Sequence, residues 1–109
     1  MKSIESNHLV HGDLANPTNI IVKNGAVNGI IDFEFALSGD PVWEFSHTLD
    51  YPMHDYFDRT DLNSRCLDER RSLYSCLWSL FAVYLNAKNP DLAEPLWALY
   101  QNRKDTLSD

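Results

Sequence analysis

Two short apolar runs separated by Asn24-Gly25 constrain the fold more than any other feature of this chain. Ile20-Ile21-Val22 reads as one strand, and the segment from Ala26 to Phe33 reads as the return strand. Asn-Gly is favoured in tight two-residue hairpin turns, because both turn positions need a positive φ. The sequence therefore predicts one β-hairpin, with a bulge or a close backbone approach at Gly29.

A polar loop comes before this hairpin. Leu9-Val10 is a short lead-in that we expect to be buried, and the loop then covers residues 11–19. Pro17 keeps a helix from forming there, because proline lacks an N–H and restrains the residue before it. The loop contains His11-Gly12-Asp13 and ends at Asn19, where the first strand opens.

The two ends of the hairpin carry oxygen-bearing side chains. Asn19 stands at the start of the first strand and Asp32 at the end of the second. Because a hairpin brings its ends together, we expect these residues to be neighbours, and amide and carboxylate oxygens are ligands for Mg²⁺. A carboxylate at Asp13, placed beside a hydroxyl, can accept its proton during attack on a γ-phosphate. The spacing thus indicates a phosphoryl-transfer site.

Several motifs occur together in one order along residues 9 to about 46. They are His11-Gly12-Asp13, an asparagine shortly after, the hairpin, Ile31-Asp32-Phe33, and Gly39-Asp40-Pro41. This order resembles the catalytic and metal-binding segments of the aminoglycoside phosphotransferase and choline kinase family, which is related to the protein kinases. Because several elements match in order, the resemblance is more specific than a lone triplet would be.

The resemblance implies a role for each of the matched residues. Asp13 would be the catalytic base, and His11 would support the catalytic loop. Asn19 and Asp32 would bind Mg²⁺, Glu34 would support the metal site, and Asp40 would brace the catalytic loop. The phosphate donor would be ATP or GTP, and the acceptor would be a hydroxyl of a small molecule.

The chain departs from the family pattern at the asparagine. The family usually places this residue five positions after the aspartate, but here Thr18 holds that position and Asn19 comes one residue later. Two consequences are open: the loop is longer by one residue, or metal binding is impaired.

The remainder of the chain reads as helical. Asp40 is expected as the N-cap and Pro41 as the first residue of a helix that ends before Pro52. Residues 52–63 read as an irregular loop. A long helix is expected over 64–87, and Asn89-Pro90 is the turn before a last helix that has Pro95 near its first turn.

Apolar residues recur at helical spacing over 64–87. One stripe holds Leu73, Leu77, Leu80 and Tyr84, and a second holds Tyr74, Trp78, Phe81 and Leu85, whereas polar side chains such as Ser75 and Ser79 fill the opposite side. So wide an apolar face predicts burial against at least two neighbours.

The expected fold is α+β and mostly helical. It is a partial kinase-like C-terminal lobe with a catalytic loop, one hairpin and three to four helices. We expect residues 1–109 to form a single partial domain, with the catalytic and metal-binding segment over 9–46 and a helical remainder over 47–109.

Composition and charge exclude some function classes. The net charge of −7 argues against binding to nucleic acid, which requires clustered Lys and Arg. No apolar run is long enough to cross a bilayer, and the first residues show no secretory signal. Cys66 and Cys76 fit neither a redox pair nor a zinc site, so we expect reduced thiols in a cytoplasmic protein.

The resemblance also implies parts that lie outside this sequence. The family binds its nucleotide with a small lobe that precedes the catalytic loop, and nothing before His11 can supply one. The resemblance therefore predicts a chain that is inactive alone. It also predicts bare apolar surface, and hence self-association or a partner chain that completes the lobe.

Other interpretations of the same residues remain. The chain could be a non-catalytic remnant or interaction module, or a metal-dependent phosphoesterase that uses His11, Asp13 and Asp32. The spacing of His8, His11 and Asp13 could suggest a zinc site, although such pairs in loops usually form hydrogen bonds. The acidic residues over 50–61 could bind a cationic substrate, but a solvated loop is the commoner explanation.

Overall fold

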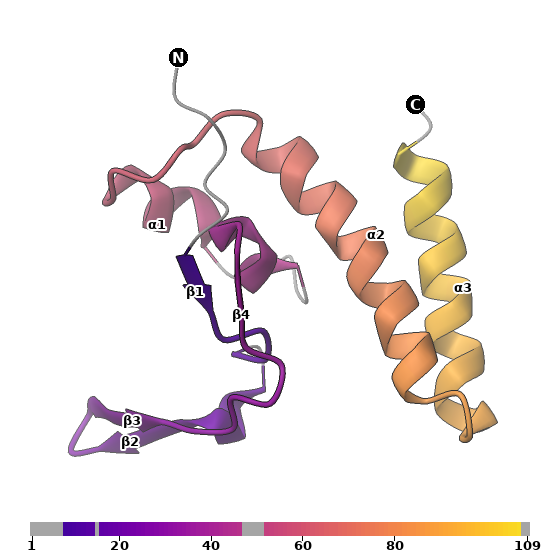
Figure 1. The fold of residues 1–109 in the computed structure, drawn as a ribbon, viewed down its shortest axis with the longest axis horizontal. Helices are drawn as coiled ribbons and strands as arrows, with labels where there is room; N and C mark the ends of the chain where they lie inside the picture. Colours follow the sequence, from indigo (N-terminus) through magenta and orange to yellow (C-terminus); the bar gives the residue numbers. More distant parts are fainter. Residues whose placement is uncertain (1–7, 15, 47–51, 108–109) are drawn as a thin grey trace.

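The fold is described by a computed structural model over residues 8–14, 16–46 and 52–107 (Figure 1). It is α+β and mostly helical, as the sequence predicts. The elements follow the order β1 (His8–Val10), η1 (Pro17–Asn19), β2 (Ile20–Lys23), β3 (Ala26–Ile30), β4 (Leu37–Gly39), η2 (Pro41–Phe45), α1 (Met53–Asp58), α2 (Leu67–Leu85) and α3 (Pro90–Leu107).

The predicted hairpin is confirmed as the antiparallel pair of β2 and β3. The turn residues Asn24 and Gly25 have φ angles of 53° and 77°, which an Asn-Gly turn accommodates easily. Ile21 pairs with Gly29 and Val22 pairs with Val27, so the return strand is bulged beside Gly29. The strand ends at Ile30 rather than Phe33, because Asp32 has a φ of 66° and cannot continue the extended backbone.

A second pair of strands was not predicted. β1 and β4 are antiparallel, with His8 opposite Gly39 and Val10 opposite Leu37. Val10 is buried whereas Leu9 is 76% exposed, because neighbouring residues of a strand point to opposite sides. The lead-in is therefore buried at one of its two positions.

The segment after Gly39 is capped as predicted, but its helix is of the 3₁₀ type. The Asp40 side chain accepts a hydrogen bond from the Val42 amide at 3.0 Å, and Pro41 is the first residue of η2. The rest of the predicted helix falls partly on residues 47–51, which lie outside the described residues. The expected irregular loop over 52–63 was wrong in part, because α1 forms there and buries Met53 and Phe57, four positions apart.

The two long helices form an antiparallel pair (Figure 1). α2 confirms the predicted helix over 64–87 with somewhat shorter bounds. α3 begins at Pro90 and contains Pro95 in its interior, so the predicted start near Pro95 was wrong. Proline fits the first turn of a helix, where its missing N–H would have no intrahelical partner.

The packing of α2 reverses the predicted burial. Ser75 and Ser79 are buried, whereas the stripe predicted to be buried is exposed: Leu73 by 47%, Leu77 by 46%, Leu80 by 40% and Tyr84 by 76%. The small serine side chains allow η2 and α3 to approach α2 closely, and their hydroxyls donate to the carbonyls of Ser46 and Cys76. α2 therefore presents its larger apolar side chains outward.

The main core lies where η2, α1 and the start of α2 meet. Its buried members are Val42, Phe45, Met53, Phe57 and Leu67. This cluster anchors the segment that directly follows β4. Among the described residues, none of the helices is both long and apolar enough to cross a membrane.

Candidate active site

The loop over residues 11–19, which the resemblance predicts to be the catalytic loop, leaves β1 through a backbone conformation that only glycine adopts easily. Gly12 has a φ of +89°, and a Cβ at this position would lie 2.5 Å from the carbonyl oxygen of Phe35. The loop therefore packs directly on the turn that joins the hairpin to β4. This close approach explains why glycine stands between His11 and Asp13.

His11 links the loop to the segment that follows the hairpin. Its buried ring accepts a hydrogen bond from the Asp13 amide at Nδ1 (3.1 Å), so the ring proton is assigned to Nε2, which donates to the Ile31 carbonyl at 2.8 Å. The ring also meets the edge of Phe33 at a centroid distance of 4.7 Å. Its contacts fix the backbone of Asp13 relative to residues 31–33.

The structure brings Asp13 and Asn19 together. Asn19 is 3% exposed, and its Nδ2 donates to both the backbone carbonyl and the Oδ2 of Asp13, at 3.0 and 2.9 Å. The single turn of η1, capped by Asn16, leaves Thr18 exposed and turns Asn19 inward. The extra residue is accommodated in η1, and Asn19 still reaches Asp13. The consequence of the unusual spacing for metal binding stays a prediction.

Asp32 and Glu34 lie on the chain beside this pair. The Ile31 amide donates to the Asn19 carbonyl at 2.9 Å. Asp32 is the next residue along the chain after Ile31, so its backbone lies near Asn19. The side chains of Asp32 and Glu34 are both exposed. A shared cation between Asn19 and Asp32 stays a prediction.

The oxygen atoms near Asp13 can be compared with the ligands that Mg²⁺ requires. Nδ2 of the buried Asn19 donates to Asp13, so Oδ1 is the atom of this side chain that would bind a cation. No three His, Cys, Asp or Glu side chains of the described part of the chain gather as a metal cluster, which also leaves the zinc interpretation without support. Mg²⁺ usually takes only one or two protein ligands and completes its shell with phosphate and water, so the residues present fit it.

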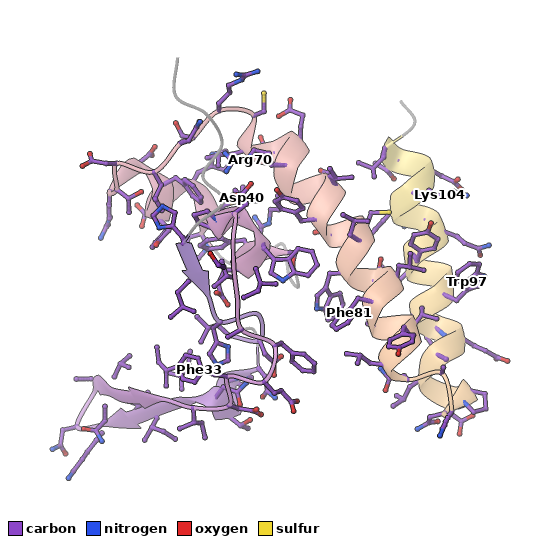
Figure 2. The ribbon with its side chains drawn as sticks, in the orientation of Figure 1. Phe33, Asp40, Arg70, Phe81, Trp97 and Lys104 are labelled. Carbon is purple, nitrogen blue, oxygen red and sulfur yellow. The ribbon has the colours of Figure 1, made fainter. Side chains whose placement is uncertain are left out.

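A pocket of about 440 Å³ opens beside Asp13. Asp13 and Glu34 line it from the catalytic side, and Trp78, Phe81 and Leu85 line it from α2. Figure 2 shows Phe81 on the side of α2 that faces the catalytic loop, and Phe35 meets its ring edge-on at a centroid distance of 5.8 Å. The pocket thus joins a carboxylate to an apolar wall.

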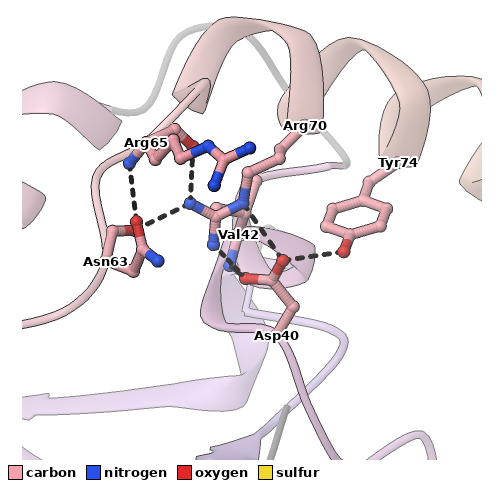
Figure 3. A network of polar contacts seen from close by, with 6 residues as sticks. All are labelled: Asp40, Val42, Asn63, Arg65, Arg70 and Tyr74. Atoms are coloured by element: carbon pink, nitrogen blue, oxygen red, sulfur yellow. Dashed lines mark hydrogen bonds and ion pairs between the residues drawn. The ribbon is translucent and has the colours of Figure 1, made fainter. Parts of the chain in front are cut away.

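Asp40 forms a buried polar network that ties η2 to α2 (Figure 3). It accepts hydrogen bonds from Arg70 Nη2 at 2.6 Å and from the Tyr74 hydroxyl at 2.7 Å, in addition to the capping bond from Val42. Burial alone would raise the pKa of the Asp40 carboxyl, but the hydrogen bonds from Arg70, Val42 and Tyr74, together with the charge of Arg70, outweigh it and lower this pKa from its ordinary value of 3.8. Burial and the bond to Asp40 raise the pKa of Tyr74 to about 12.

The residue that holds the catalytic loop directly is Glu44, which the sequence analysis missed. Its carboxylate accepts from the amides of His11 (2.7 Å) and Gly12 (3.1 Å). Within the described residues, the hydrogen bonds of Asp40 go to η2 and α2, so the direct bracing expected of Asp40 is made by Glu44. The only sequence signal for this contact is that Glu44 is an acidic residue four positions after the N-cap Asp40. An acidic residue at that position is equally common on an exposed helix surface, so the signal does not predict the contact.

Comparison with known proteins places these residues in a family. The family model described as the phosphotransferase enzyme family matches residues 5–74, which include the catalytic loop, the hairpin and the first turns of α2. No curated protein and no solved structure matches the chain significantly.

Proposed function

The chain belongs to the phosphotransferase enzyme family, and we propose that it carries the catalytic segment of a small-molecule kinase that transfers the γ-phosphate of ATP or GTP to a hydroxyl group. The observation that supports this most is the state of Asp13. One of its carboxylate oxygens is held by the buried Asn19, and the residue lines an open pocket. A positioned carboxylate beside a pocket is what a general base for an acceptor hydroxyl requires.

In the proposed reaction, the acceptor oxygen attacks the γ-phosphorus, and its proton passes to the unheld oxygen of Asp13. The bond between the γ-phosphorus and the β–γ bridging oxygen breaks, and the nucleoside diphosphate leaves with that oxygen. Asn19 and Asp32, supported by Glu34, would hold Mg²⁺, which supplies positive charge for the phosphate oxygens.

The nucleotide itself needs further positive charge. Among the described residues, no lysine or arginine lines either of the two described pockets. We therefore propose that nucleotide binding requires groups beyond these residues, and that activity belongs to an assembly that contains them.

Asp13→Asn tests the role of the proposed base. In the assembly that turns over ATP, we expect kcat to fall by about 100-fold or more, which is the usual size of general-base catalysis, with little change in the Kd for Mg-ATP. Asp58→Asn, which changes an exposed aspartate at the end of α1, should keep the wild-type rate. A near wild-type rate in Asp13→Asn would remove Asp13 from the mechanism.

The metal site can be tested without nucleotide. Mn²⁺ added to the isotope-labelled chain should broaden the NMR amide signals around residues 13, 19 and 32 before all others. Asn19→Leu should abolish this selective broadening. Broadening spread over the acidic surface, unchanged in Asn19→Leu, would refute the proposed ligands.

The exposed apolar stripe on α2 favours one other function, a non-catalytic interaction module. Calorimetry with Mg-ATP separates the two, because an interaction module should bind no nucleotide in any assembly. Phosphoryl transfer that depends on Asp13 would exclude the module.

A further inference from the structure

Asn16 stands at the start of η1, between the proposed base and the proposed metal ligand. Its side-chain Oδ1 accepts hydrogen bonds from the amide of Thr18 at 3.2 Å and from the hydroxyl of Thr18 at 2.7 Å. Its backbone amide donates to the Asp13 carbonyl at 3.2 Å, and its own carbonyl accepts from the Asn19 amide at 3.1 Å. Asn16 is therefore bonded to three residues of the loop, to each through a different group.

These contacts close a ring of hydrogen bonds between Asp13, Asn16 and Asn19. The Asp13 carbonyl accepts from the Asn16 amide and from Asn19 Nδ2, and the Asn16 carbonyl accepts from the Asn19 amide. A change in the backbone angles of Asn16 would break the two bonds that its own N–H and carbonyl make. The conformation of Asn16 thus affects both the proposed base and the buried side chain that holds it.

The backbone of Asn16 is held by its own side chain. Asn16 is the N-cap of η1 and has an extended conformation (φ −81°, ψ 108°), which suits the residue before Pro17. The extended region is broad, and Pro17 has no N–H that could bond to the cap. The bonds from Thr18 select one conformation within this region, because an Asx side chain that accepts from the amide two residues on closes a turn.

This cap also decides which residue faces Asp13. Thr18 holds the position at which the family usually has its asparagine, but its amide and its hydroxyl are both bonded to Asn16 and the residue is exposed. Asn19, one position later, is the residue that is buried against Asp13. An arrangement with residue 18 turned inward would require Thr18 to leave Asn16.

From these contacts we propose that Asn16 is a positioning residue for phosphoryl transfer. It holds the longer loop in the arrangement that keeps the Asn19 side chain on Asp13. Asn16 lines neither of the two described pockets, so it acts through these two neighbours. This inference rests on the proposed function, which assigns the base to Asp13 and a metal ligand to Asn19.

Hydrogen exchange of the Asn19 side-chain amide, measured by NMR, tests the positioning without metal or nucleotide. In Asn16→Ala this amide should exchange about fivefold faster, because loss of an N-cap typically has an effect of this size. Asn16→Ser keeps a capping oxygen and adds no charge, so it should restore the wild-type rate. An unchanged rate in Asn16→Ala, or equal rates in Asn16→Ala and Asn16→Ser, would overturn the proposal.

Thr60→Ala is the matched control for a loss of overall stability. The Thr60 hydroxyl also accepts from the amide two residues on, that of Leu62 at 3.3 Å, but it lies after α1 and away from the loop. Thr60→Ala should leave the exchange of the Asn19 side chain at the wild-type rate. If Thr60→Ala and Asn16→Ala raise this rate equally, the effect is general destabilisation and the proposal fails.

The affinity for Mn²⁺ gives a second measurement, which a merely structural role of Asn16 would not change in the folded chain. The Kd obtained from the Mn²⁺ titration at residues 13, 19 and 32 should rise about fivefold in Asn16→Ala. It should return to the wild-type value in Asn16→Ser and stay unchanged in Thr60→Ala. A wild-type Kd in Asn16→Ala would contradict the positioning role.

An exchange of residues tests whether Asn16 fixes which side chain turns inward. Asn19→Ala should lose the selective Mn²⁺ effect, and adding Thr18→Asn should not restore it, because Asn16 keeps residue 18 outward. Recovery of Mn²⁺ binding in the double variant would show that the loop can turn residue 18 inward, and would overturn the proposal.

The outcomes separate this inference from the proposed function. Faster Asn19 exchange in Asn16→Ala, with no selective Mn²⁺ effect in the wild type, would support the positioning by Asn16 and refute the metal site. Selective Mn²⁺ binding in the wild type, with the same Asn19 exchange in all variants, would refute only the role of Asn16.

Discussion

Glu44 fixes the catalytic loop through two successive backbone amides, those of His11 and Gly12. An ionised carboxylate has two acceptor oxygens and no donor, so it matches two N–H groups that point the same way. The left-handed conformation of Gly12 and its close contact with Phe35 determine the backbone between these amides and Asp13. The backbone position of the proposed base is therefore set by Glu44 and Phe35.

Glu44→Gln tests this support. The amide offers one acceptor and one donor group, so one loop amide loses its partner. Hydrogen bonds to charged groups contribute about 1.5–3 kcal/mol, and we expect a loss of about 2 kcal/mol in the free energy of unfolding, measured by urea denaturation. In the assembly that turns over ATP, kcat should fall while the Kd for Mg-ATP stays the same. The exposed Glu94→Gln on α3 is the control, and equal stability of the two variants would contradict the role of Glu44.

Elements are joined by the buried pair of Asp40 and Arg70. Both side chains are 7% exposed, and the guanidinium also donates to the carbonyls of Asn63 and Arg65. The network fastens the start of η2 to the first turns of α2 and to the segment before it (Figure 3). It thereby holds the helix that forms one wall of the pocket against the helical turn that carries Glu44.

Asp40→Asn should destabilise the protein in a pH-dependent way. Removing one partner leaves a buried charge unpaired, which costs about 3–5 kcal/mol at pH 7. Because the folded pKa of Asp40 lies below 3.8, its contribution is present above that pH and is lost as the pH falls through the lower folded value. The stability difference between wild type and variant should shrink below about pH 4.

Denaturant titrations between pH 3 and pH 7 measure this effect. Asp58→Asn, which changes an exposed aspartate, should differ little from wild type at pH 7. A constant difference between wild type and Asp40→Asn at every pH would show that the Asp40 carboxylate is not the titrating group.

At the scale of the whole molecule, α2 carries an outward apolar stripe formed by Leu73, Leu77, Leu80 and Tyr84. Its members follow the 3–4 spacing typical of helix pairs, and residues 72–87 contain no charged side chain. Contiguous exposed apolar surface of this kind usually marks an interface.

We therefore expect the chain to self-associate through this stripe. Replacing both Leu73 and Leu77 by Lys should shift the mass measured by analytical ultracentrifugation to that of a monomer, because charged side chains cannot be buried at the contact. Leu92→Lys, at an exposed leucine of α3, should leave the association unchanged. A wild-type monomer at all concentrations, with a cooperative thermal transition, would contradict this expectation.

The sequence alone determined the features that depend on neighbouring residues. The Asn24-Gly25 turn, the bulge beside Gly29 and the Asp40 cap follow from local backbone preferences, and the long helical periodicity predicted α2. The order of motifs from His11 to Asp40 indicated the family, because each motif is contained in a few consecutive residues.

Only the tertiary structure decided the features that depend on distant residues. β1 pairs with β4 although the entire hairpin lies between them in the sequence. Glu44 accepts hydrogen bonds from a loop that lies more than thirty positions before it. The buried side of α2 was predicted wrongly, because periodicity shows that a helix has two faces but not which face its neighbours approach. Small serines with satisfied hydroxyls allowed η2 and α3 to pack there, and this close packing left the leucines outside.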